Sequence, residues 1–89
     1  MKVETEHDFK ELRKHLDSWR KKFPMFKHDV YQIEHIVEKH IQNYSIIMVQ
    51  YRQTKSRACI EKAQHEIDEI NRVLELVGKM ELMALLSQR

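Results

Sequence analysis

Hydrophobic residues recur along the first quarter of the chain with the spacing of one face of an α-helix. They stand three, four, three and four positions apart, which places them on a single stripe. They are Phe9, Leu12, Leu16, Trp19 and Phe23. Thr5 and Asp8 have the spacing of an N-terminal capping pair, and Pro24 disfavours helical geometry at the residue before it. The pattern predicts a helix over about 5–23 and a sharp corner at Pro24.

A second set of apolar positions follows the corner, and no glycine or proline interrupts residues 27–77. Its members are Val30, Ile33, Val37, Ile41, Tyr44, Met48 and Tyr51. They predict a helix over about 26–52. A buried strand over 44–51 is the alternative for this β-branched run, but no other segment is suited to pair with it. The polar stretch 50–57 is the one further candidate for a turn, because Thr54 or Ser56 can cap a following helix.

The most regular pattern lies in the last third of the chain. Six apolar positions spaced by three or four residues form one stripe, namely Ile60, Ala63, Ile67, Ile70, Leu74 and Val77. A second stripe overlaps its end and consists of Val73, Leu76, Met80 and Met83. The last turns also carry Leu82, Leu85 and Leu86, so they are apolar nearly all round. The pattern predicts a helix over about 55–88 that runs through Gly78, with an apolar end of the kind found at interfaces.

These elements predict an all-α fold in one of two arrangements. In the first, the three helices form a three-helix bundle or helical hairpin, as a single domain over 1–89 or a piece of a longer protein. In the second, residues 27–88 form one continuous helix, on the order of 90 Å long, that pairs with a second chain as a coiled coil. The two differ in whether residues 53–56 form a turn.

Composition excludes several other classes of protein. With one glycine and one proline in 89 residues, the chain lacks the turn residues of a β-sandwich and the glycines of a phosphate-binding loop. Cys59 is the single cysteine, which excludes an internal disulfide and favours a cytoplasmic location, with the nucleus as the alternative. The longest apolar run, residues 46–49, is far shorter than the roughly 20 residues that span a bilayer.

Candidate chemistry is sparse. The six histidines do not cluster in the sequence, and Glu4 with His7 is the one pair at the spacing of carboxylate-bridged metal sites. No serine lies in a nucleophile motif, and Cys59 has no recognisable histidine and acid arrangement around it. We therefore expect no enzyme, no cofactor and no bound metal.

The first helix carries basic side chains on one face. They are Lys10, Arg13, Lys14, Arg20 and Lys21. The net charge of +2 is too small to indicate nucleic-acid binding. Pairs such as Asp17 with Lys21, four positions apart, favour a solvated face. A nucleic-acid-binding helical domain that uses this face is the alternative function.

The sequence favours a non-enzymatic helical module for protein interaction or oligomerisation. We expect a coiled-coil scaffold or adaptor of the cytoskeletal, centrosomal, kinetochore or vesicle-tethering kind, whose partner is a second copy or a helix of another protein. The expected interface residues are Ile60, Ile67, Ile70, Leu74, Val77, Met80, Met83 and Leu86. The expected core anchors near the corner are Leu16, Trp19, Phe23 and Phe26.

Overall fold

The computed structural model describes residues 1–87, and these residues form helices without any strand. The three α-helices are α1 (Phe9–Lys22), α2 (Lys27–Thr54) and α3 (Arg57–Ser87). Two short 3-10 turns, Glu6–Asp8 and Pro24–Phe26, precede α1 and α2. The prediction of an all-α fold is confirmed.

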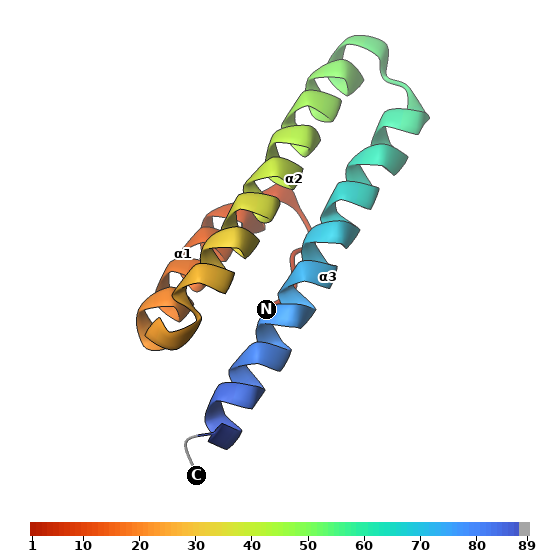
Figure 1. The fold of residues 1–89 in the computed structure, drawn as a ribbon. Helices are drawn as coiled ribbons and strands as arrows, with labels where there is room; N and C mark the ends of the chain where they lie inside the picture. Colours follow the sequence, from red (N-terminus) through yellow and green to blue (C-terminus); the bar gives the residue numbers. More distant parts are fainter. Residues whose placement is uncertain (88–89) are drawn as a thin grey trace.

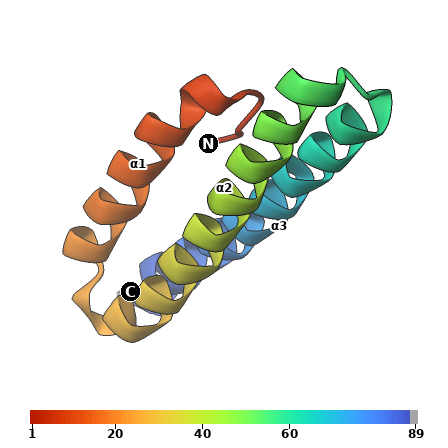
Figure 2. The same cartoon turned by 90° about the horizontal axis from the view of Figure 1, so that it is seen from above.

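α2 and α3 form a long antiparallel hairpin, and α1 lies along one face of it (Figure 1). Seen from above, α1 runs beside α2, and α3 passes behind α2 (Figure 2). The molecule is elongated, with principal extents of 54 × 18 × 16 Å. Because α1 has 14 residues and α2 has 28, α1 covers only about half the length of the hairpin.

α1 begins later than the sequence pattern predicts. Residues 6–8 form a 3-10 turn, and the α-helix starts at Phe9. The Asp8 carboxylate accepts hydrogen bonds from the backbone N–H groups of Glu4 and Thr5, at 2.8 and 3.2 Å. These bonds lower the pKa of Asp8. The bond from the N–H of Thr5, the N-cap residue, is the capping contact that the spacing of Thr5 and Asp8 predicts.

The corner lies where the proline predicts it. Phe23 has φ −124° and ψ 73°, which is outside the helical region, and Pro24 opens the next turn. The Trp19 ring lies against both neighbouring phenylalanines, with centroid distances of 5.1 Å to Phe23 and 6.1 Å to Phe26. This aromatic cluster fills the junction of α1 and α2.

The second reversal of the chain falls within the polar stretch 53–56. α2 continues to Thr54, two residues beyond its predicted end, and α3 starts at Arg57. Lys55 adopts a left-handed conformation with φ 53° and ψ 26°, and its N–H donates to the Tyr51 carbonyl at 2.7 Å. The N–H of Ser56 donates to Thr54 Oγ1 at 3.3 Å. The chain therefore ends one helix and starts the next within two residues.

One core holds the three helices together. The predicted stripe of α1 is buried from Phe9 to Phe23, and half-buried Phe26 packs against the same core. α2 contributes Val30, Ile33, Val37, Ile41 and Tyr44, and α3 contributes Ala63, Ile67, Ile70, Leu74, Val77 and Ala84. Val3, from the segment before α1, is also buried. The predicted core anchors Leu16, Trp19, Phe23 and Phe26 thus all lie in or against this core.

Candidate protein-interaction surface

Polar side-chain contacts show which side of α2 faces each of the other helices. Glu34 binds Arg20 of α1 at 3.3 Å, whereas His40 binds Glu66 of α3 at 2.5 Å. In Figure 1, α1 lies behind the hairpin of α2 and α3. The front face of the hairpin is therefore left without a covering helix, and we call it the open face.

The His40–Glu66 pair lies on the seam between α2 and α3, and helical spacing shows what surrounds it. Residues seven positions apart lie on nearly the same side of a helix, as do residues four apart. Ile36 and Ile47 therefore share the side of His40, and Val73 shares the side of Glu66. Ile47 and Val73 are partly buried against the core. The His40–Glu66 pair thus has apolar neighbours on both helices.

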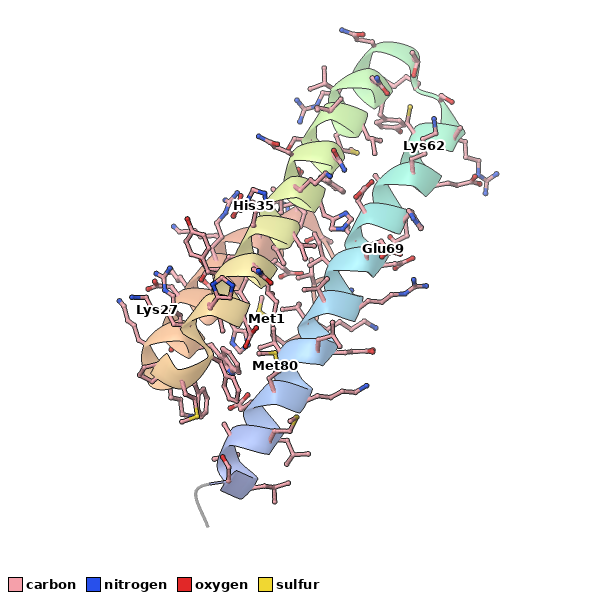
Figure 3. All side chains as sticks on the ribbon, in the orientation of Figure 1. Met1, Lys27, His35, Lys62, Glu69 and Met80 are labelled. Carbon is pink, nitrogen blue, oxygen red and sulfur yellow. The ribbon has the colours of Figure 1, made fainter. Side chains whose placement is uncertain are left out.

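α3 presents a second apolar stripe beside this seam. Val73, Leu76, Met80 and Met83 are spaced three, four and three positions apart, which is the spacing of a coiled-coil seam. Leu76 is 54% exposed and Met83 63% exposed, while Val73 and Met80 are partly buried. Met80 lies on the side of α3 that faces α2 (Figure 3). Together with half-exposed Ile36 of α2, these four residues make up what we call the open-face stripe.

A groove continues this surface toward the connection between α2 and α3. It is lined by Ile47, Ala58, Glu61, Lys62, His65 and Glu66. Its wall on α2 is apolar and its wall on α3 is mostly charged. The open face thus combines an apolar half near the end of α3 with a more polar half near its start.

The structure divides the predicted interface residues between the core and the surface. Ile67, Ile70, Leu74 and Val77 are buried among the chain's own helices, so in this fold they are inaccessible to a partner. Met80 is half-buried, and Ile60, Met83 and Leu86 are exposed.

Leu76 and Ile36 belong to the surface although they are absent from that predicted set. The sequence does contain a signal for both. Each stands directly before a core residue, Val37 or Val77. Neighbouring helical positions point about 100° apart, so an adjacent apolar pair indicates two apolar faces.

Two of the predicted basic residues fasten α1 to α2. Arg13 forms a two-pronged ion pair with Glu38, with distances of 2.6 and 3.0 Å. The hydrogen bonds from Arg13 lower the pKa of Glu38, and the same contact raises the pKa of Arg13. Arg20 bridges Asp17, at 2.6 Å, and Glu34. The charges of both arginines are therefore neutralised at the helix contact.

The three predicted basic lysines lie at the exposed surface of α1. Lys14 is 3.7 Å from Glu11, and Lys21 is 3.1 Å from Asp17. Lys10 is exposed, and no carboxylate among residues 1–87 forms an ion pair with it. Four of the five basic residues of this face thus have acidic partners, which leaves little free positive charge for a phosphate backbone.

Within the described part of the chain, no three histidine, cysteine or carboxylate side chains are arranged to hold a metal ion. The Cys59 thiol is half-buried beside the Thr54 hydroxyl, at 4.0 Å. None of the helices in residues 1–87 is long and apolar enough to cross a membrane.

No family model matches this chain, and neither the curated proteins nor the solved structures give a match. The open-face stripe combines coiled-coil spacing with exposed apolar side chains.

Proposed function

We propose that this chain is a non-enzymatic helical interaction module, and that a helix of a partner protein docks on the open face. The observation that carries the proposal is the stripe Val73, Leu76, Met80 and Met83, which has coiled-coil spacing. Val73 and Met80 pack at the edge of the chain's own core, whereas Leu76 and Met83 are exposed. A helix laid along the groove between α2 and α3 covers this stripe and Ile36 together. Such a complex is a four-helix arrangement, in which α1 and the partner lie on opposite faces of the hairpin.

The free energy available from this surface is moderate. Complete burial of a leucine, isoleucine or methionine side chain contributes about 1.5–3 kcal/mol. Because Ile36, Leu76 and Met83 are about half exposed, their burial contributes roughly 1 kcal/mol each. Exposed Leu82, Leu85 and Leu86 near the end of α3 enlarge the apolar surface that a longer partner helix can reach. This range suits the reversible binding of a scaffold or adaptor in the cytoplasm.

Nucleic-acid binding by α1 is the weaker alternative. Arg13 and Arg20 are occupied by carboxylates at the contact with α2. A phosphate backbone would have to compete with these ion pairs for the same guanidinium groups.

A charge-insertion experiment tests the proposed surface. The double variant Leu76→Asp and Met83→Asp places two carboxylates on the open-face stripe. The matched control is Ile46→Asp and Val49→Asp, which changes two similarly exposed side chains of α2 (58% and 50%) outside the stripe. Both variants should keep the helical circular dichroism of the parent chain, because all four sites are solvent-accessible.

The readout is the set of proteins retained by each immobilised chain, with the affinity of any retained partner measured by titration. We expect the parent and the control to bind the same partner, and the stripe variant to lose at least tenfold in affinity. Equal affinity of the stripe variant and the control would refute a docking role for the open face.

A further inference from the structure

The connection between α2 and α3 is short and strained. Only Lys55 and Ser56 lie between the two helices. Within residues 1–87, Lys55 is the one residue with a positive φ, and it carries a side chain where this conformation favours glycine. Short hinge loops under strain are the usual starting point for exchange of an element between identical chains.

The residues across this connection are compatible with an uninterrupted helix. Residues 53–57 read Gln-Thr-Lys-Ser-Arg and contain neither glycine nor proline. A change of backbone angles at Lys55 and Ser56 alone would join α2 and α3 into one helix over 27–87. Such a helix is about 90 Å long at 1.5 Å per residue, whereas the hairpin molecule measures 54 Å along its longest axis.

An opened chain cannot remain alone in water. Opening withdraws α3 from α1 and α2 and exposes a face that is otherwise buried, with Ile67, Ile70, Leu74 and Val77 at its centre. The complementary surface is that of α1 with α2. A second copy of this chain supplies this surface with the correct shape and charge.

We propose that two copies of this chain exchange α3, so that α3 of each copy packs on α1 and α2 of the other. Every contact of α3 with the rest of the chain then re-forms between copies. The His40–Glu66 pair is one such contact, and the two hydrogen bonds between Asn71 and Val3, each 2.8 Å long, are another. The left-handed conformation at Lys55 is no longer needed.

The unit that receives the exchanged helix stays intact in this process. α1 is held to α2 by the Arg13–Glu38 pair and by the packing of Trp19 on Phe23 and Phe26. None of these contacts involves α3. The exchanging arm is therefore α3 alone.

This inference rests on the proposed interaction function and names a second copy as one partner, although the surface it uses is the buried face of α3. Variants at the connection test it. Lys55→Gly removes the strain of the hairpin, whereas Lys55→Ala combined with Ser56→Ala favours the continuous helix. Lys79→Ala, an exposed lysine in the interior of α3, is the control.

The measurements are light scattering behind size-exclusion chromatography across concentration, and small-angle X-ray scattering of any dimer. We expect the double-alanine variant to dimerise at a concentration roughly tenfold or more below the parent chain, since each dimer contains two hinges. Lys55→Gly should require a correspondingly higher concentration, and Lys79→Ala should behave as the parent. The dimer should be about 90 Å or more in length.

Two results would overturn the exchange. One is a double-alanine variant that stays monomeric up to millimolar concentration. The other is a dimer whose dissociation constant is the same in the glycine and alanine variants. The open-face proposal fails separately. If Leu76→Asp with Met83→Asp keeps every partner while the hinge variants shift the dimer, the exchange stands and docking on the open face does not. If instead the stripe variant loses its partner while the hinge variants do not shift the dimer, docking on the open face stands and the exchange does not.

Discussion

The segment before α1 is attached to α3 by one asparagine, and this contact gives a sharp stability prediction. The Val3 N–H donates to Asn71 Oδ1, and Asn71 Nδ2 donates to the Val3 carbonyl. The two residues are 68 positions apart in the chain. Val3 is only 1% exposed and belongs to the core. We predict that Asn71→Ala releases this segment and destabilises the fold.

The magnitude follows from the contacts that are lost. Two hydrogen bonds contribute about 0.5–1.5 kcal/mol each to the free energy of unfolding. If Val3 then leaves its buried site, about 1.5 kcal/mol of hydrophobic stabilisation is lost as well. The higher helix propensity of alanine raises the free energy of unfolding by roughly 0.5 kcal/mol. The net loss is about 2–4 kcal/mol, a substantial part of the roughly 4–13 kcal/mol expected for a domain of this length.

Urea unfolding followed by circular dichroism measures this loss, and hydrogen exchange of the Val3 amide shows whether the segment is released. Asn43→Ala is the matched control, because Asn43 is half-buried on α2 and makes no side-chain hydrogen bond to any of residues 1–87. Asn71→Asp provides a second comparison, since a carboxylate still accepts from the Val3 N–H but repels the Val3 carbonyl.

The prediction is wrong if the unfolding free energies of Asn71→Ala and Asn43→Ala agree within about 0.5 kcal/mol and the Val3 amide stays protected from exchange in both. The Asn71–Val3 contact then does not hold the segment before α1 in place.

Three further changes probe other parts of the fold. Ile70→Asp should cost more than about 4 kcal/mol and unfold much of the chain, because this side chain is fully buried; a folded variant in thermal melts would contradict the assigned core. Gly78→Ala should raise the free energy of unfolding by about 0.5–1 kcal/mol, since an added Cβ meets nothing within 4 Å. Arg13 lowers the pKa of Glu38, so the pair stabilises the fold at neutral pH and loses this contribution as the pH falls below about 4.5. The free energy of unfolding of Glu38→Gln should therefore fall less than that of the parent when both are measured from pH 7 into acid. Parallel curves of unfolding free energy against pH would exclude the coupling.

The three helical segments and the corner at Pro24 were predictable because their causes are local. Pro24 restricts Phe23 directly, and the three apolar stripes follow from residue spacing alone. The turn at 53–56 was only one of two alternatives. Its decisive feature is the left-handed conformation of Lys55, and a lysine gives no local signal for this conformation.

The candidate surface was predictable only in part. The sequence shows two overlapping stripes on α3, but not which of them faces the chain's own core. That choice depends on where α1 packs, through pairs such as Arg13 with Glu38 that are 25 positions apart. The burial of Val3 was also missed. An isolated valine among charged residues has no periodicity, and its partner Asn71 is 68 positions away.

Because α1 is short, local stability should decrease along the hairpin from the end beside α1 to the end that α1 does not reach. The Phe9 ring at its start meets Tyr44 of α2, at a centroid distance of 5.3 Å. Beyond this contact, the end of α2 and the start of α3 support each other without a third helix. Amide hydrogens there should exchange with solvent through small local openings, whereas those beside Trp19 should need nearly global unfolding. The end of the hairpin that contains Lys55 should thus open at a lower free energy than the end beside Trp19.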